Sequence, residues 1–134
     1  MLKLNSSGVY QWVYTVGDSD TDFGWALETD SSNNSYITGY FQDTVNFGGG
    51  NITSVGNRDV FVLKLNSSGV YQWVYTAGST GDDHSYGLDI DSSGNIYAVG
   101  SFHSTINFGG GNITSAGEYD VFVVKLNSSG QYSD

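Results

Sequence analysis

The sequence predicts an all-β protein built from β-propeller blades, each blade a sheet of four antiparallel strands. The segment Leu2–Thr15 returns letter for letter at Leu63–Thr76, and its first half returns with one change at Val124–Gly130. The step is 61 residues both times, and 39 of the 61 positions of the first two units are identical without a gap. Each unit also carries short apolar segments separated by turn residues, and none of them shows the period of a helix.

The chain is therefore one repeat module, residues 1–134, in units of 61 residues. The units span residues 2–62 and 63–123, and a partial third unit spans residues 124–134. The two full units differ mainly in clusters, for example at residues 18–24 against 79–85 and at residues 57–58 against 118–119. One structural unit thus recurs, and it varies at its tips.

Four strands are expected in each unit. In the second unit they are Tyr86–Asp91, Ile96–Phe102 and Asp120–Leu126, and the fourth is seen intact one unit earlier as Val70–Thr76. The matching segments of the first unit are Trp25–Asp30, Tyr36–Phe41, Asp59–Leu65 and Val9–Thr15. The middle strands are apolar on both faces, as in a blade packed between two others. Between the first two strands of the second unit, Asp91 is expected to accept backbone N–H groups of the turn Ser92–Asn95.

A long loop joins the second and third strands of each unit, and it is expected to hold a small hairpin of its own. Its strands flank a run of glycines, and they are Val45–Phe47 with Asn51–Ser54 in one unit and Ile106–Phe108 with Asn112–Ser115 in the next. The glycine run precedes no lysine and no helix, so it is interpreted as a turn and not as a phosphate-binding loop.

Composition excludes several classes of function. The net charge is −10, with only four Lys and Arg residues, which argues against nucleic acid and anionic membranes as partners. There is no cysteine, so disulfides, zinc–thiolate sites and thiol nucleophiles are excluded. No apolar run approaches the length of a membrane-spanning helix. No signal peptide is recognisable, since Met1 stands where the other units carry Val62 and Val123.

The segments DSSGNIYAVGSF (residues 91–102) and DVFVVKLNSSG (residues 120–130) resemble the bacterial β-propeller repeat known as the SBBP repeat, and DSSGNIY is more distantly similar to NHL repeats. The resemblance covers essentially the whole chain and implies a propeller fold. It also implies an extracellular or cell-surface location in a bacterium. It carries no catalytic motif, and a shared fold does not fix a function.

Two units are too few to close a propeller, which typically has four to eight blades. Open blades would leave apolar faces and unpaired edges in water. The faces are expected to be lined by Phe61, Leu63, Trp73, Tyr75, Phe122 and Trp12. The sequence therefore predicts a closed homo-oligomeric ring with an even number of blades. Three chains and six blades are expected, with a dimer or a tetramer as the alternatives.

The ends of the chain refine this prediction. Met1–Leu4 and Val121–Leu126 both match the third strand of a unit, so both fit the slot beside Val9–Thr15. We expect Val121–Leu126 of one chain to pair with Val9–Thr15 of its neighbour. Whether Met1–Leu4 or the C-terminal strand is then displaced stays open at this stage.

The long, varied connections are expected to lie together on one face, which is the candidate binding face. Aromatic and histidine side chains near that face form the candidate ligand site: Trp25, Tyr86, Tyr40, Tyr119, His84 and His103. Aromatic rings beside Asp and Asn side chains can stack on sugars, but packing between blades explains the same rings. The two histidines, one in each of two loops, also fit simple surface residues and form neither a metal site nor a triad.

Acidic residues supply two further candidates. Asp18, Asp20 and Asp22, with Asp82 and Asp83 in the partner loop, could offer oxygens to Ca²⁺, although the loop lacks the glycine and glutamate of an EF-hand and a solvated acidic loop is the alternative. Glu28 and Asp89 occupy equivalent positions and could line the channel of a ring, or else bond to backbone and solvent. No other cofactor is expected.

These observations predict a non-catalytic module that acts as a structural or adhesive binding platform of a bacterial surface or secreted protein. A carbohydrate-binding propeller with sites on the long-loop face is the alternative. An enzyme is disfavoured because the chain has one arginine and no converging cluster of catalytic residues.

Overall fold

The computed structural model describes all 134 residues as thirteen β-strands and no helix. No part of the chain forms a helix long and apolar enough to span a bilayer. The strands are β1 (Leu2–Leu4), β2 (Tyr10–Val13), β3 (Phe23–Thr29), β4 (Ser35–Phe41), β5 (Thr44–Asn46), β6 (Asn51–Thr53), β7 (Asp59–Leu65), β8 (Tyr71–Ala77), β9 (His84–Ile90), β10 (Ile96–Phe102), β11 (Thr105–Asn107), β12 (Asn112–Thr114) and β13 (Asp120–Leu126).

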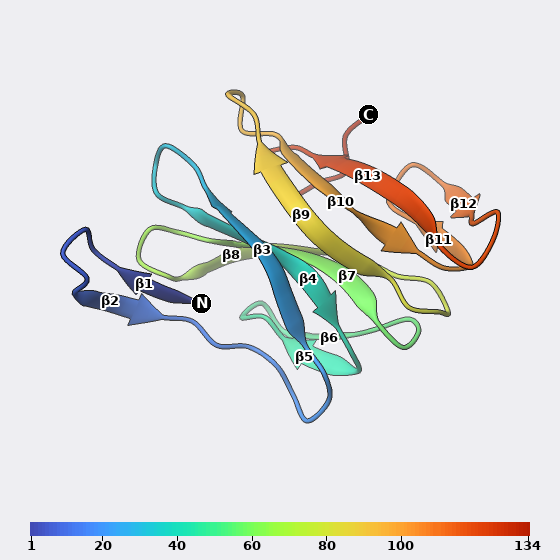
Figure 1. Cartoon of the computed structure of the whole chain (residues 1–134), viewed down its shortest axis with the longest axis horizontal. Coiled ribbons are helices and arrows are strands. Elements are labelled where there is room, and N and C mark those ends of the chain that lie inside the picture. The colour runs from blue at the N-terminus through green and yellow to red at the C-terminus, as the bar shows by residue number, and fades with distance from the viewer.

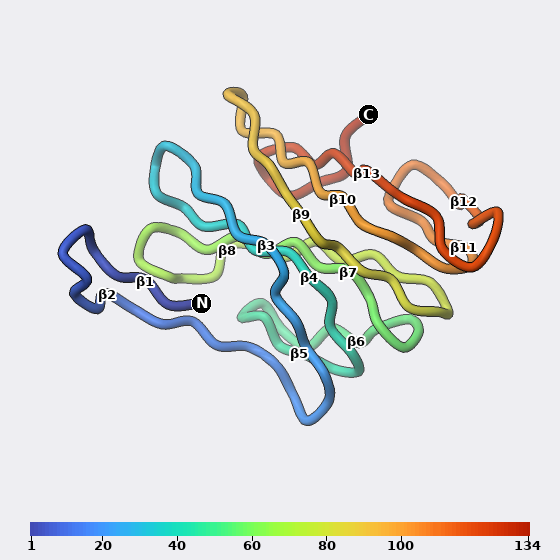
Figure 2. Tube along the Cα trace, in the orientation of Figure 1, coloured from blue at the N-terminus to red at the C-terminus, as the bar shows by residue number.

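Two larger antiparallel sheets pack against each other, and a two-stranded hairpin lies beside the first of them (Figure 1). We call β3-β4-β7-β8 sheet 1, β9-β10-β13 sheet 2 and β1-β2 the N-terminal hairpin. Both sheets follow chain order, with the small hairpins β5-β6 and β11-β12 inserted before their third strands. The N-terminal hairpin and β13 lie at opposite ends of the molecule (Figure 2).

The repeat pattern located the strands well. The expected strands Ile96–Phe102, Asp59–Leu65 and Asp120–Leu126 are confirmed to the residue. The Asp turns are confirmed too, since Asp91 Oδ1 accepts the N–H groups of Ser93 and Asn95 at 2.9 Å each. The expected small hairpins exist, although each of their four strands ends one residue earlier than expected.

Other boundaries need correction. β3 and β9 begin at Phe23 and His84, two residues before the expected starts, because a register shift after Gly24 and Ser85 lets pairing continue past an unpaired residue. β2 is shorter than the expected Val9–Thr15, because its partner β1 is only three residues long. The ends of β4 and β8 differ from expectation by a single residue, which is ordinary fraying.

Two apolar cores hold these layers together. The larger core lies between the two sheets and joins side chains such as Val60 and Val62 of sheet 1 to Phe122 and Val124 of sheet 2. The smaller core lies between sheet 1 and the N-terminal hairpin, around Phe61. Sheet 1 is thus covered on both faces, which explains why β7 is apolar along almost its whole length.

The expectation about which residues line the open faces was partly wrong. Phe61, Leu63 and Phe122 are buried, because the N-terminal hairpin covers one face of sheet 1 and sheet 1 covers the inner face of sheet 2. Trp12, Trp73 and Tyr75 are partly buried against the same two cores. The outer face of sheet 2 is left in water, where Val121 is 77% and Val123 is 67% exposed.

Equivalent tyrosines fasten each layer to the next. The hydroxyl of Tyr14 donates to the carbonyl oxygen of Phe47 at 2.6 Å, and that of Tyr75 donates to Phe108 at 2.7 Å. Burial raises the pKa of both phenols. In each case a tyrosine in or just after the last strand of one layer binds the small hairpin of the next layer, 33 residues away.

We expect Tyr75→Phe to lower the free energy of unfolding by about 1 kcal/mol, because it leaves the buried carbonyl of Phe108 without its donor. Tyr71→Phe is the matched control, since the Tyr71 hydroxyl makes no hydrogen bond while its ring packs on Gly48 and Gly49. Urea unfolding at one protein concentration measures both variants. Equal losses for the two variants would show that the hydroxyl bond contributes nothing.

Candidate functional site

An aromatic cluster lies where the two sheets meet, at the end that carries the long loops. Phe23 begins β3, Tyr40 stands near the end of β4, and His84 begins β9, so antiparallel pairing brings them to one end of the sheets. The ring centroids of Tyr40 and His84 are 4.8 Å apart, and those of Phe23 and Tyr40 are 5.8 Å apart. We call this cluster, completed by Trp25 and Tyr86, the aromatic seam.

Trp25 reaches the seam because it is the unpaired residue of the register shift in β3. Gly24 pairs with Gly39 and Ala26 pairs with Thr38, so Trp25 has no partner across the strand. Its ring stacks on Phe23 at 5.5 Å and meets the edge of Tyr86 at 5.8 Å, with 73° between the planes. Trp25 and Tyr86 remain 51% and 49% exposed, so both present ring surface to solvent.

Polar side chains border the seam. The guanidinium of Arg58 lies 4.9 Å from the Tyr40 ring centroid, and its Nη1 lies 3.8 Å from Asp82 Oδ2. Asp82 Oδ1 also accepts a hydrogen bond from Asn57 Nδ2 at 2.7 Å. The Nε of Arg58 is buried without a hydrogen-bond partner. These groups give the rim of the seam both donors and acceptors.

His84 contributes an imidazole whose pKa lies below its ordinary value. Burial lowers its pKa, and the nearby Arg58 charge lowers it further, whereas Asp82 and Asp83 act in the opposite direction. Its Nδ1 lies 3.2 Å from the Tyr86 hydroxyl. The seam therefore offers a hydrogen-bonding group beside two exposed rings.

The structure brings the predicted ligand residues together only in part. Trp25, Tyr40, His84 and Tyr86 form one continuous set of ring contacts. Tyr119 and His103 form a separate pair with ring centroids 5.6 Å apart. Partial burial raises the pKa of Tyr119, and the charge of Asp82 raises it further. Ligand binding by these residues stays a prediction.

Sequence reasoning missed Phe23 and Arg58. Both stand among the positions at which the two units differ, since Phe23 corresponds to His84 and Arg58 to Tyr119. The clustering of these differences was the signal that could have found both residues, because the loop tips that differ are the ones that meet at the seam.

The predicted calcium residues serve mainly to close loops. Asp22 accepts the N–H groups of Asp18 at 3.0 Å and Gln42 at 3.2 Å, and Asp18 accepts the N–H of Asp20 at 2.7 Å. The equivalent Asp83 is fully buried and accepts two further backbone N–H groups. No three acidic or histidine side chains gather into a group that could hold a metal ion.

The predicted channel carboxylates lie on equivalent, exposed positions. Glu28 is near the end of β3 and Asp89 is near the end of β9, and neither is buried by another part of the chain. Asp89 Oδ1 accepts the N–H of Ile90 at 2.8 Å, which matches the alternative of bonding to local backbone. Whether they line a channel depends on the assembly and stays a prediction.

Comparison with known proteins gives a distant similarity to a repeat protein. No protein-family model matches the sequence. An uncharacterized WD repeat-containing protein of Acanthamoeba polyphaga mimivirus is 23% identical over 117 residues, which covers 74% of this chain and 8% of the relative. The chain therefore spans about 8% of the length of the curated relative that it matches. The similarity is to a repeat protein and agrees with a propeller-like architecture.

Proposed function

We propose that this chain is a non-catalytic β-propeller repeat module that acts as a structural or adhesive binding platform of a bacterial surface or secreted protein. Sheet 1 has the four strands of one blade, sheet 2 has three strands of the next, and the N-terminal hairpin has two strands of the one before. The repeat of 61 residues and the similarity to a WD repeat-containing protein support this assignment.

One observation carries the proposal: several of the residues that differ between the units meet at the aromatic seam, whereas much of the apolar core is repeated. Phe23, Trp25, Tyr40 and Arg58 correspond to His84, Tyr86, Ser101 and Tyr119. By contrast, Val60 and Val62 recur unchanged as Val121 and Val123. A constant scaffold that presents a varied loop surface is the usual arrangement of a binding module.

The polar groups of the molecule support a non-catalytic role. His103 Nδ1 lies 2.8 Å from the Ser104 hydroxyl, which is the nearest approach to a nucleophile and base. The two are adjacent residues in one loop, and no carboxylate side chain is hydrogen-bonded to the other ring nitrogen to orient it.

A carbohydrate is the second candidate ligand, and the exposed rings of Trp25 and Tyr86 favour it. Sugar C–H groups pack on aromatic faces, and the rim formed by Asn57, Asp82 and His84 could bond to hydroxyl groups. The net charge of −10 favours neutral or basic sugars over acidic ones.

A binding panel of immobilised glycans and extracellular proteins tests both candidates. If the seam is the binding surface, Trp25→Ala should weaken binding at least about ten-fold, because it removes a stacking surface worth about 1.5 kcal/mol or more. Val55→Ala is the matched control, since Val55 is 69% exposed in a long loop outside the seam.

The outcomes separate the candidates. Binding to glycans that Trp25→Ala abolishes supports the carbohydrate module, and binding to proteins alone supports the adhesive platform. Binding that Trp25→Ala and Val55→Ala weaken equally would rule out the seam. Turnover of any panel member would contradict the non-catalytic proposal.

A further inference from the structure

β13 and β2 are less completely paired than β7 and β8, the equivalent strands of sheet 1. β13 pairs with β10 on one side, and on its other side it carries only an isolated bridge between Leu126 and Tyr132. β2 pairs with only the three residues of β1. By contrast, β7 in sheet 1 lies between β4 and β8 along its whole length. Unpaired edges of this kind are sites at which another strand can add.

The interface between the two sheets shows how the face beside such an edge packs when another sheet covers it. There Tyr36, Val60 and Val62 of sheet 1 pack against sheet 2 and are 2%, 0% and 0% exposed. Their equivalents 61 residues later are Tyr97, Val121 and Val123 on the outer face of sheet 2. Those three side chains are 36%, 77% and 67% exposed, although the chemistry of the face is the same.

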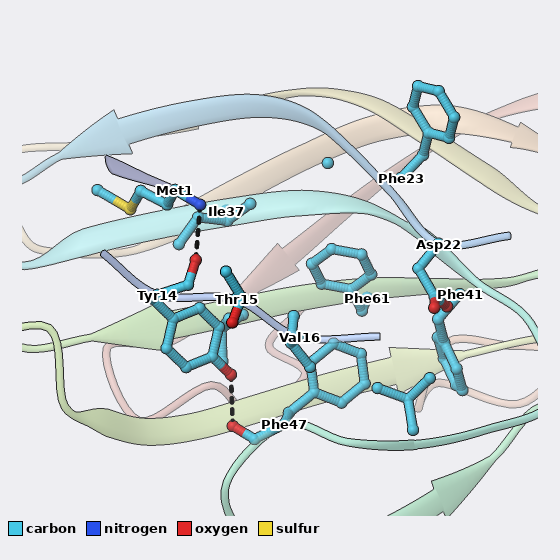
Figure 3. Close-up of a pocket in the computed structure, with 13 residues that line it drawn as sticks. Met1, Tyr14, Thr15, Val16, Asp22, Phe23, Ile37, Phe41, Phe47 and Phe61 are labelled. Carbon is cyan, nitrogen blue, oxygen red and sulfur yellow. Dashed lines mark hydrogen bonds between the residues drawn. The ribbon is translucent and has the colours of Figure 1, made fainter. Parts of the chain in front are cut away.

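The opposite end of the molecule has the complementary hollow. A cavity of about 260 Å³ lies between the N-terminal hairpin and sheet 1 (Figure 3). Its lining is mostly apolar and includes Met1, Tyr14, Val16, Phe47 and Phe61. The residues equivalent to Tyr14, Phe47 and Phe61 are Tyr75, Phe108 and Phe122, which in the interface between the sheets pack with Val60 and Val62. The cavity therefore lies where valines of a preceding sheet would pack.

We propose that a second copy of this chain fills that cavity, with its β13 pairing along β2 and its Val121 and Val123 inserting beside Tyr14. The register follows from β7 and β8, in which Val60 pairs with Ala77 and Val62 pairs with Tyr75. Val121 and Val123 lie one unit after Val60 and Val62, and Val16 and Tyr14 lie one unit before Ala77 and Tyr75. In the assembly Val121 therefore pairs with Val16 of the neighbouring copy, and Val123 pairs with its Tyr14. This inference rests on the propeller assignment proposed above.

The structure also indicates whether β1 or the β13 strand of a neighbouring copy takes the position beside β2. β1 has three residues, pairs on one side only, and leaves Leu2 and Leu4 exposed. β13 pairs with β10 over seven residues and buries Val124 and Leu126 in the larger core. β1 is therefore the strand that is displaced. Tyr132 is displaced as well. It covers Gly109 and Gly110 in the way that Tyr71 covers Gly48 and Gly49, and in the assembly the equivalent Tyr10 of the neighbouring copy takes that place.

The contact joins two different surfaces, so it is head to tail and must close into a ring or grow without limit. With β1 displaced, each copy supplies two complete blades to a closed ring. The new interface also extends the candidate binding surface, because it sets Tyr86 of one copy beside Trp25 of the next. Each interface of the ring would then join one tryptophan to one tyrosine.

Light scattering on the 134-residue chain tests this proposal independently of any ligand. We expect a single species near three times the 14.4 kDa chain mass, and two or four times that mass would support the same contact. Val123→Asp should give a monomer with an unchanged circular dichroism spectrum, because Val123 is 67% exposed in the isolated chain. Val55→Asp, at a valine that is 69% exposed elsewhere, should leave the assembly intact. A monomeric or polydisperse parent chain would overturn the proposal.

Two further variants test the register and the displaced strand. The chain has no cysteine, so Val16→Cys with Val121→Cys should form disulfides between copies. Val16→Cys with Val123→Cys is two residues out of register and should cross-link at least about ten-fold less. Deleting Met1–Leu4 should preserve the assembly. Loss of the assembly on that deletion, or equal cross-linking of the two cysteine pairs, would contradict the proposed exchange.

Discussion

Gly39→Ala should destabilise the protein by on the order of 3 kcal/mol, because it forces extra volume between two paired strands. A methyl group on Gly39 would overlap the carbonyl oxygen of Phe23 in the neighbouring strand β3. Backbone cannot rotate out of the way as a side chain can, so the first residues of β3 would have to separate from β4. The midpoint of urea unfolding measures the loss.

Gly24→Ala is the matched control, since Gly24 is the cross-strand partner of Gly39. A methyl group there would meet only the Cγ2 of Ile37 at 3.5 Å, which is ordinary contact. The equivalent residue of the second unit is Ser85, so the position accepts a side chain. We expect a change within about 1 kcal/mol, and a small gain is compatible with a reduced entropy of the unfolded chain. Equal losses for the two variants would contradict the steric argument.

The same glycine connects the fold to the candidate site. The close approach of β3 to β4 at Gly39 accompanies the register shift that leaves Trp25 unpaired and half exposed. Gly100 of the second unit is placed in the same way against His84. Gly39→Ala should therefore disturb ligand binding at the seam as well as stability, whereas Trp25→Ala should affect binding with little loss of stability.

The sequence was informative wherever the repeat and the strand pattern agreed. An apolar run bounded by Asp and Asn turns located β7, β10 and β13 to the residue. Both faces of β7 are buried, and β10 and β13 repeat the apolar pattern of the buried strands β4 and β7. The starts of β3 and β9 could not be located, since a register shift depends on a partner strand and has no local signal in one unit.

The direction of each face was also beyond sequence reasoning. Phe61 and Val60 are neighbours in β7 and equally apolar, yet one faces the N-terminal hairpin and the other faces sheet 2. Their equivalents Phe122 and Val121 show the consequence, because Phe122 is buried and Val121 is exposed. Strand alternation predicts that such neighbours face opposite sides but does not predict which side is covered.

The candidate site shows the same limit. Four of the six predicted ligand residues meet at the seam because strand ends gather at one edge of stacked sheets, which the topology implies. The pairing of Arg58 with Asp82 joins two loops that are distant in sequence. It depends on the packing of one sheet on the other, and no spacing within a unit indicates it.

Asp83→Ala should lower the free energy of unfolding by roughly 3 kcal/mol, because it leaves the buried N–H of Ser79 and the partly buried N–H of His103 without their acceptor. The Asp83 carboxylate is fully buried and accepts the N–H of Ser79 at 2.6 Å and that of His103 at 3.0 Å. It thereby joins the loop before β9 to the end of β10, 20 residues away. Both loops border the seam, so their separation should also weaken binding there.

The repeat supplies the control for this experiment. Asp22→Ala removes the equivalent carboxylate, which accepts the N–H groups of Asp18 and Gln42 in a less buried loop. Water can replace those bonds, so a loss below about 1 kcal/mol is expected. Asp83→Asn should fall between the two, because it keeps one acceptor oxygen. It also removes a carboxylate that adds to the effect of burial in raising the pKa of Asp59. If Asp22→Ala costs as much as Asp83→Ala, burial does not set the strength of this link. In that case the two units close their loops with equal stability.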